Sequence, residues 1–398
     1  MAKYHYGGQA LIEGVLMRGR NALAVALRHP DGSIVWASER LDLGLRARKA
    51  MKFPFVRGLV LLYDTLVTGT RWLVRSATLQ ALALEEGDDA GTGAATGAGA
   101  GAGTGAATGP GAATILSSLP TVATRLAVAL FAGPALCAAS YTDPDATPPA
   151  EASDAEKGLG KGYTVAVGGM LFVSLLIGIV VFFLVPLILA RATIGRIDQG
   201  FGLQLAEGVI RVALFIGYLL LMARSADVSR TFQYHGAEHM SIHALEAGDP
   251  LTVDAARGYP TAHPRCGTEF LVVVLIVSIL AFAVVGSGPL YYLVATRVVL
   301  IPVIAAISYE ILQLGARHRG HAFVRWLWSP GIWVQAITTK RPTDDMIEVA
   351  LVSLRQALTA DGAEIPAGST ELACRPLGGI SGDDSSGTDP IAAPAGAK

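Results

Sequence analysis

Charge is scarce in this sequence. Asp, Glu, Lys and Arg make up 16% of the 398 residues, whereas hydrophobic residues make up 52%, and the mean hydropathy is +0.47. Ordinary soluble proteins of this size are less apolar, so we expect membrane-spanning helices. The net charge of −1 gives no indication that the chain binds nucleic acid.

Cysteine is scarcer still. Cys137, Cys266 and Cys374 are widely separated, so they form neither a disulfide framework nor a CxxC pair. A reducing compartment suits at least the loop that carries Cys266. The first residues, MAKYHYGGQALIEG, also lack the basic and then apolar pattern of a secretory signal peptide. We therefore expect internal apolar segments to place the chain in a membrane.

Four apolar segments are candidate membrane spans: residues 163–190, 203–223, 270–286 and 290–309. The first contains no charged residue over 28 positions, and a span needs about 20. The second contains Glu207 and Arg211, which can pair because residues four apart share a helix face; this helix either spans or lies in the interface. Intramembrane charges are costly and often functional. We interpret the pair as a structural lock between helices, with a functional role as the alternative.

Residues 1–84 indicate a small folded region outside the lipid. Two short apolar runs, 22–29 and 34–41, flank the turn sequence Pro-Asp-Gly-Ser, which predicts a β-hairpin. From residue 53 to about 84, polar and apolar residues recur with helical spacing, which predicts an amphipathic helix. The predicted fold class is mainly α: a polytopic helical membrane protein with a small N-terminal α+β cytoplasmic region, formed by the β-hairpin and the amphipathic helix.

The remaining segments differ in composition. Residues 85–162 form a low-complexity linker, with an interrupted apolar stretch at 115–140 that we interpret as an interfacial helix. The membrane domain covers 163–310. Residues 311–365 predict cytoplasmic interfacial and amphipathic helices, because tryptophans and cations together mark a membrane interface. From residue 366 to 398 the composition turns to Gly, Ser, Asp and Pro, which predicts a disordered tail.

Cationic residues set the expected orientation. Residues 1–80 hold twelve Lys or Arg, and the region after Tyr309 is also basic. With four spans, the positive-inside rule places the N-terminus, the loop 224–268 and the C-terminal region in the cytoplasm. A further crossing at 115–140 would break this agreement, and we therefore place that segment in the interface.

Histidines are few, eight in all, and three of them fall in the sequence FQYHGAEHMSIH at 232–243. On a helix, His235 and His239 lie on one face, so both imidazoles can bind one ion. With Glu238 they fit the pattern H-x-x-E-H, in which two histidines hold zinc and the glutamate is the base that acts on a metal-bound water. The alternative is a polar helix end whose histidines satisfy backbone groups or lipid phosphates.

More distant residues can complete such a site. A proline follows His263 and holds it on an extended segment; Cys266 is close in sequence, and His with Cys suits zinc. Their alternative roles are a loop cap and a small buried residue. Glu310, at the end of the last span, has a suitable position for a distant third ligand. Arg265 or Arg230 can stabilise a developing oxyanion.

The run GGQALIEGVLMRG at 7–19 carries two charges in an otherwise apolar stretch. One interpretation is a surface ion pair between Glu13 and Arg18, which would contribute little to stability. The other is that Glu13 faces the histidine site. The pattern alone favours neither.

Seven motifs occur in order along nearly the whole chain, except 85–160 and the tail. They are GGQALIEGVLMRG at 7–19, FPFVRG at 53–58, EGVIR at 207–211, FQYHGAEH at 232–239, HPRCGT at 263–268, ISYE at 307–310 and PGIWVQAITTKRP at 330–342. Together they resemble the YqhQ-like family of bacterial membrane proteins, a domain of unknown function often described as predicted metal-dependent enzymes. That family usually has Lys after the second histidine, where this chain has Met240, which removes a charge beside the proposed site.

Two hypotheses about function follow. In the first, the chain is a metal-dependent hydrolase at the cytoplasmic face of the bacterial inner membrane, with Glu238 and Arg265 as catalytic residues. Its zinc ligands would come from the set His235, His239, His263, Cys266 and Glu310. In the second, the chain is a non-catalytic membrane scaffold, or an assembly or transport partner, whose polar motifs are structural. Membrane lipid is the expected partner in both, and a protein partner and a homo-oligomer stay open.

Overall fold

The computed structural model describes residues 6–41, 51–92, 169, 173–174, 176–194, 201–264, 266–286, 288–318 and 320–377. Most of the predicted linker, including 115–140, lies outside these residues. The strands are β1 (Gly7–Leu11), β2 (Gly14–Arg18), β3 (Ala22–Arg28), β4 (Ile34–Arg40) and β5 (Arg375–Pro376). The helices are α2 (Val56–Thr92), η2 (Val180–Leu184), α5 (Val185–Thr193), α6 (Phe201–Met222), α7 (Ala226–Ala247), α8 (Val253–Arg257), α9 (Thr268–Val285), α10 (Leu290–Arg317), α11 (Ala322–Thr338) and α12 (Asp344–Ala360).

The sheet is an antiparallel meander, β1-β2-β3-β4, to which β5 adds in parallel beside β4. β3 and β4 are the predicted hairpin, with Ala22 opposite Arg40. β1 and β2 form a second hairpin that the sequence did not predict. Its two-residue turn holds Glu13 at a φ of 54°, a backbone conformation that residues other than glycine seldom adopt.

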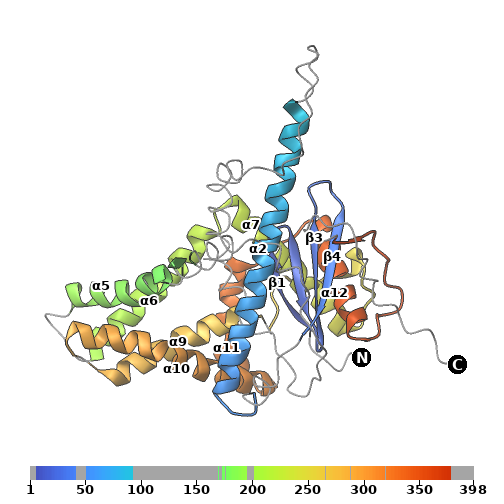
Figure 1. Ribbon diagram of the computed structural model, residues 1–398. Coiled ribbons are helices and arrows are strands. Elements are labelled where there is room, and N and C mark those ends of the chain that lie inside the picture. The colour runs from blue at the N-terminus through green and yellow to red at the C-terminus, as the bar shows by residue number, and fades with distance from the viewer. Residues whose placement is uncertain are drawn as a thin grey trace.

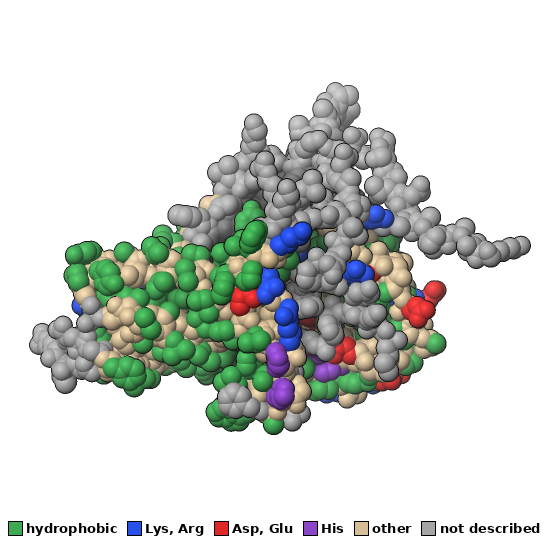
Figure 2. Space-filling view, turned by 90° about the horizontal axis from the view of Figure 1, so that it is seen from below, with side chains coloured by type: hydrophobic (Ala, Val, Ile, Leu, Met, Phe, Trp, Pro, Cys, Tyr) green, Lys and Arg blue, Asp and Glu red, His purple; other side chains and the backbone are tan. Residues whose placement is uncertain are grey.

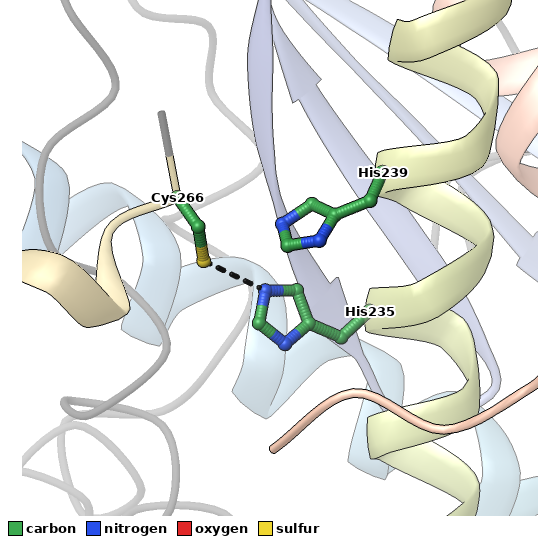
Figure 3. A group of neighbouring side chains, drawn as sticks. All are labelled: His235, His239 and Cys266. Atoms are coloured by element: carbon green, nitrogen blue, oxygen red, sulfur yellow. Dashed lines mark hydrogen bonds between the residues drawn. The ribbon is translucent and has the colours of Figure 1, made fainter. Parts of the chain in front are cut away.

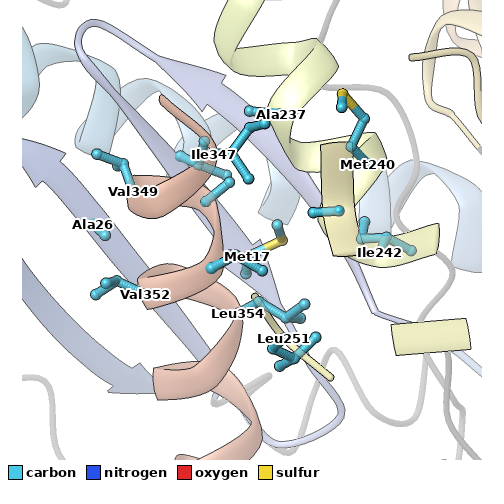
Figure 4. Close-up of a cluster of buried hydrophobic side chains, with 14 of the residues drawn as sticks. Met17, Ala26, Ala237, Met240, Ile242, Leu251, Ile347, Val349, Val352 and Leu354 are labelled. Carbon is cyan, nitrogen blue, oxygen red and sulfur yellow. The ribbon is translucent and has the colours of Figure 1, made fainter. Parts of the chain in front are cut away.

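Helices cover both faces of the sheet, which explains why β1 and β2 show no alternation of polar and apolar residues. Leu16 and Leu23 face α2 and pack with Trp72. Met17 and Ala26 point the other way, into a core shared with α7 and α12 (Figure 4). Successive side chains of a strand point to opposite faces, so a strand covered on both sides is apolar throughout. We call this region the sandwich domain.

Helix α12 is the amphipathic helix that the sequence predicted near the C-terminus, and its apolar face belongs to the core of the sandwich domain. Its side chains pack against β2, β3 and α7, and Ser353 donates a hydrogen bond to the Ala24 carbonyl. Residues 366–377, expected in a disordered tail, instead follow the domain edge: β5 pairs with β4, and the Leu377 N–H donates to Trp36 O at 2.7 Å. The described part of the tail is therefore ordered against the sheet.

The other region is a bundle in which four helices are long and apolar enough to cross a membrane: Leu176–Thr193, Phe201–Met222, Thr268–Val285 and Leu290–Arg317. Within the described part of the chain, these four helices coincide in part with the four predicted segments and are compatible with a membrane protein. In Figure 1 they extend from the sandwich domain to one side, and Figure 2 shows that the visible surface of this part is largely hydrophobic. Lys, Arg and His side chains appear in Figure 2 along the border between the two regions.

A buried cluster of charges joins the helices of the bundle. Arg211 pairs with Glu207 at 2.5 Å, as the four-residue spacing predicted, and Arg297 of α10 pairs with the other oxygen of Glu207 at 2.6 Å. Arg211 Nε also donates to the Phe182 carbonyl at 3.0 Å. Phe182 lies in the π-helical segment η2, four residues before Pro186, which has no N–H to donate. The cluster therefore ties together η2, α6 and α10.

Candidate metal centre

Helix α7 connects the two regions of the molecule and carries the histidine motif. It begins directly after α6 and ends at Gly248, whose positive φ of 80° closes the helix. Tyr234, Ala237 and Met240 turn one face of α7 into the core of the sandwich domain. The histidines lie on another face, where α7 meets the residues before α9 and the end of α11.

Three side chains converge at this meeting point. His235, His239 and Cys266 each offer one ligand atom, and these atoms lie within 4.8 Å of one another. Figure 3 shows the two imidazoles one turn apart on α7, with the sulfur approaching from the segment before α9. All three residues are buried, at 2%, 1% and 6% exposure respectively. We call them the His–His–Cys cluster.

Backbone carbonyls hold both imidazoles in one orientation. His235 Nδ1 lies 2.9 Å from Thr338 O, and His239 Nδ1 lies 2.6 Å from Thr261 O. A carbonyl oxygen only accepts, so each Nδ1 is the donor, and in a neutral imidazole Nε2 then carries the lone pair. Histidines that ligate metals usually have this outer partner, which fixes the tautomer and the ring orientation. The arrangement therefore makes Nε2 of both residues available to a metal ion.

The sulfur of Cys266 sits just before the first turn of α9. Its Sγ lies 3.2 Å from His235 Nε2, and it accepts hydrogen bonds from the Thr268 N–H and the Thr268 hydroxyl. Burial, and then the negative charge of Glu238, raise the pKa of the Cys266 thiol to about 12. A bound cation would act in the opposite direction, because metal ligation deprotonates a thiol.

Glu238 lies beside the cluster and is buried. The N–H of Gly8, in β1, hydrogen-bonds its carboxylate, and the second oxygen, Oε2, has no hydrogen-bond partner among the described residues. Burial raises the pKa of Glu238 to about 7, against a lowering by His235. A Cβ at Gly8 would lie 2.4 Å from the Leu16 carbonyl oxygen and 3.0 Å from Glu238 Cδ, so glycine is needed where β1 approaches both β2 and this carboxyl group.

Burial also sets the protonation of His239. It lowers the pKa of this imidazole well below its usual value, and the neighbouring His235 and His263 act in the same direction. His239 is therefore neutral at physiological pH. A neutral imidazole is the form that binds a metal ion.

The other predicted site residues lie at different distances from the cluster. The His263 ring centroid is 5.7 Å from that of His239, but His263 Nε2 is 3.3 Å from Glu246 Oε2. Glu310 accepts from Arg57 and from the Phe55 N–H at the start of α2, so the structure does not bring it to the cluster. Arg265 lies outside the described residues.

The two charges of the first hairpin have other partners than expected. Arg18 pairs with Asp64 of α2 and not with Glu13. Glu13 instead binds Arg230 through two hydrogen bonds of 2.5 and 2.6 Å, and it accepts from the Tyr234 hydroxyl at 3.2 Å. The expected Glu13–Arg18 pair is therefore absent. Glu13 lies against α7, and its bonds attach the β1–β2 turn to that helix.

Sequence reasoning missed the groups that support the cluster. Thr261 and Thr338 act through backbone carbonyls, which any residue provides, so no residue pattern could reveal them. Gln335 is different: its side chain accepts from the His263 N–H at 2.9 Å and donates to the His263 carbonyl at 3.0 Å. A buried polar residue within the apolar sequence of α11 was the only signal for it.

Known proteins resemble this chain over most of its length. The family model described as "Protein of unknown function (DUF1385)" matches residues 53–360, which include every residue of the cluster. The chain is 28% identical over 354 residues to the "Uncharacterized protein YqhQ" of Bacillus subtilis (strain 168), and the alignment covers 89% of this chain and 92% of that protein. No solved structure matches the chain.

Proposed function

This chain belongs to the DUF1385 family of proteins of unknown function, and from that premise we propose that it is an integral membrane protein with a zinc centre formed by His235, His239 and Cys266. One observation carries the proposal. Two imidazole nitrogens and a sulfur lie within 4.8 Å of one another in a buried place, and the buried carboxyl of Glu238 is near enough to raise the pKa of Cys266. The two nitrogens and the sulfur are electron-pair donors, so one cation can bind all three, and the carboxylate of Glu238 beside them adds negative charge that favours a cation.

The donor set and its charge both suit zinc. Zinc prefers histidine and cysteine ligands, and the combination of imidazole with thiolate disfavours the hard ions magnesium and calcium. With the thiol of Cys266 and the carboxyl of Glu238 ionised, the two negative charges balance a divalent cation. Burying that neutral assembly costs less than burying either anion alone.

We further propose that the centre supports hydrolysis. Three protein ligands leave one position of a tetrahedral zinc site open, which is typical of catalytic zinc, and a bound zinc ion would supply an acidified water there. Glu238 would accept the proton of that water. Its pKa of about 7 supports this role, because a general base works best when its pKa is near the working pH.

The burial of the cluster favours a second candidate, a non-catalytic scaffold. All three ligands are almost inaccessible, as in structural zinc sites, where the ion contributes to folding. In that case zinc would fasten α7 of the sandwich domain to the beginning of α9 in the bundle. The polar motifs would then hold the two regions together without turnover.

Metal content tests the zinc centre. The protein, purified in detergent without chelator after zinc has been supplied, should contain about one zinc per chain by mass spectrometry. A His235→Ala/His239→Ala variant should contain none while eluting as a folded species in size-exclusion chromatography. A matched His318→Ala variant, which removes an exposed histidine at the end of α10, should keep the metal. A metal-free wild type would exclude the zinc centre.

Glu238→Gln separates the two candidates. The variant should keep zinc, since Glu238 is not one of the three ligands. If the chain is a hydrolase, wild type but not the variant should cleave a chromogenic ester or a fluorogenic peptide. If the chain is a scaffold, neither protein cleaves these probes, and a chelator lowers the melting temperature of both. Equal cleavage by both proteins would remove Glu238 from the mechanism.

The proposed orientation places the sandwich domain and the cluster in the cytoplasm, as the positive-inside rule favours. Cys374 is exposed on the sandwich domain, whereas Cys266 is buried. In a Cys137→Ser background, a membrane-impermeant maleimide should therefore label Cys374 only after the cells are permeabilised. Labelling of intact cells would reverse the orientation.

A further inference from the structure

Helix α11 begins and ends on the side of the bundle that carries the sandwich domain. It follows α10, whose last turns meet the start of α2 through the Arg57–Glu310 pair. At its other end, Thr338 touches His235. Its 17 residues span roughly 25 Å, less than the roughly 30 Å of a bilayer core. Helix α11 therefore packs against the ends of α9 and α10 that lie near the sandwich domain, and it does not span the bilayer.

The two faces of α11 are both apolar but have different surroundings. On the inner face, Gly331 packs so closely on α9 that a Cβ there would lie 2.8 Å from Glu269 Cγ, and Val334 is buried. On the outer face, Trp326 is 69% exposed and Trp333 is 70% exposed, with exposed Ile332 between them. An exposed face with two tryptophans is unfavourable in water and typical of a membrane interface.

Two further features identify lipid as the occupant of the outer face. The face continues the apolar surface of the spans, where Leu314 on the last turn of α10 is also exposed. Exposed cationic or titratable side chains, Arg317, His318 and His321, precede α11 and suit the phosphates of lipid headgroups.

The inner end of α11 supports the candidate site. Gln335 holds both backbone groups of His263. The carbonyl of Thr338 is the outer partner of His235. The Thr339 hydroxyl lies 3.4 Å from that of Thr261, whose carbonyl is the outer partner of His239. One helix thus faces lipid on one side and, through its last turn, orients both histidines of the cluster.

We propose that α11 is an interfacial membrane helix that couples lipid contact to the geometry of the metal site. When Trp326 and Trp333 are seated in lipid, the last turn of α11 holds Thr338 against His235 and the site binds metal tightly. When that seating is lost, the imidazoles lose their fixed orientation. Loss of an outer partner typically weakens metal affinity about 10- to 100-fold. The inference rests on the proposed zinc centre.

Lipid contact is measured first, and it does not depend on the metal. In nanodiscs of phosphatidylglycerol and phosphatidylcholine with brominated acyl chains, tryptophan fluorescence should be quenched. The quenched part should disappear in Trp326→Phe/Trp333→Phe and persist in Trp36→Phe, which alters the sandwich domain. Quenching that does not depend on Trp326 and Trp333 would overturn the interfacial position of α11.

The coupling is measured by titrating metal-free protein in nanodiscs with Co²⁺, whose thiolate charge-transfer band reports ligation by Cys266. Trp326→Ala/Trp333→Ala should bind Co²⁺ about 10- to 100-fold more weakly than wild type. Leu280→Ala/Val284→Ala, which trims exposed residues of α9 far from the site, should bind like wild type. Gln335→Leu should keep the quenching and still bind Co²⁺ more weakly, because it cuts the contact of α11 with the His263 backbone, whose carbonyl also accepts from the Cys266 N–H.

The outcomes separate the two proposals. If wild type binds no Co²⁺, the zinc centre and the coupling both fail, while the quenching experiment still determines where α11 lies. If wild type binds Co²⁺ and the folded tryptophan and Gln335 variants bind it equally well, the coupling alone is overturned. If the tryptophan variant does not fold, Gln335→Leu decides the coupling in the same way.

Discussion

Two glutamates, Glu207 in the bundle and Glu238 on α7, are almost completely buried, and their surroundings differ in kind. Each oxygen of Glu207 accepts a hydrogen bond from a guanidinium, that of Arg211 or of Arg297. Glu238 has a backbone N–H on one oxygen, and Oε2 has no partner within the described residues. The carboxylate of Glu207 is satisfied by the chain itself, whereas the surroundings of Glu238 hold a surplus of electron-pair donors.

The structural cluster and the candidate site differ in the balance of hydrogen-bond donors and acceptors. The two arginines near Glu207 also stack on Phe282, with their guanidinium carbons 4.8 and 4.6 Å from the ring centroid, so their charge is held by the protein. Near Glu238, by contrast, two imidazoles, a thiol and a carboxyl group lie together, and all of them can accept hydrogen bonds or bind a cation. A cluster with unsatisfied acceptors has a reason to bind a cation. The cluster around Glu207 has none, because its unpartnered atom among the described residues, Arg297 Nε, is a donor.

The largest effect is expected from opening the closed cluster. Glu207→Gln leaves two buried guanidinium groups without a counter-charge, and breaking a buried ion pair in this way typically costs about 3–5 kcal/mol. We expect the variant to lose most of its folded, monodisperse species in detergent and to melt at a much lower temperature. Fluorescence-detected size-exclusion chromatography and thermal unfolding measure both.

A surface charge provides the control. Glu371→Gln removes an equal charge from a side chain that is 95% exposed, and it should leave both measurements unchanged. A Glu207→Gln/Arg297→Met double variant should recover part of the stability, because it removes one of the two unpaired charges. A stable Glu207→Gln protein would show that the cluster is not the closed structural unit described above.

Local geometry explains which parts of these clusters could be predicted from the sequence. The pairing of Glu207 with Arg211 and the shared face of His235 and His239 both follow from a spacing of four on a helix. The contacts that complete the clusters, Arg297 to Glu207 and Cys266 to His235, join segments far apart in the chain. For Arg297 the sequence signal is a charged residue in an apolar region, which indicates that a partner exists but not which one. Cys266 was named as a candidate ligand beside His235 and His239 because cysteine and histidine suit zinc, although no spacing indicates their contact.

The same distinction holds for the fold. Continuous apolar runs predicted the four spans, and the turn chemistry of Pro30–Ser33 predicted β3 and β4. The hairpin β1–β2 was missed because α2 and α7 bury its opposite faces and thereby remove the alternation that identifies a strand. Helix α12 was recognised as amphipathic, but a hydrophobic stripe cannot tell a sheet from a membrane surface.

The second largest effect is expected in the pH dependence of stability, through the carboxyl group of Glu238. In metal-free protein, the pKa of folded Glu238 is about 7, above the usual 4.5, so between these values the folded state binds a proton that the unfolded state has lost. Stability from this group is complete below about pH 4.5 and is lost as pH rises through 7. Glu238→Gln should remove this decline, which amounts to on the order of 3 kcal/mol.

Chemical denaturation of wild type and Glu238→Gln, both with chelator, at pH 5.5 and pH 8 measures the decline. Taking the difference between the proteins removes most of the contribution of His239, whose depressed pKa acts in the opposite direction. Added zinc should reverse the trend for wild type, because metal binding displaces the protons. Parallel pH profiles of the two metal-free proteins would show that Glu238 is satisfied by groups not recognised here.

A smaller effect is expected where α7 touches the end of α11. A side chain at Gly236 would collide with the carbonyl oxygen of Lys340, so Gly236→Ala should push the 338–340 segment away from α7. We expect a loss of about 1–3 kcal/mol from overpacking and about 10-fold weaker Co²⁺ binding, since Thr338 moves away from His235. Gly217→Ala, on α6 with open space around it, should change neither quantity. Unchanged Co²⁺ affinity in Gly236→Ala would show that the carbonyl of Thr338 is dispensable.

The smallest effect is expected from Arg230, a polar residue close in sequence to the site. Arg230 lies five residues before His235 and is a candidate to stabilise an oxyanion, yet its guanidinium is bound to Glu13 through two hydrogen bonds and is half exposed. Arg230→Gln should therefore cost only about 0–1 kcal/mol and leave Co²⁺ affinity unchanged. A double-mutant cycle with Glu13→Gln should attribute that cost to the pair. A change in Co²⁺ affinity or in turnover would instead show that Arg230 belongs to the site, although its guanidinium is already paired with Glu13.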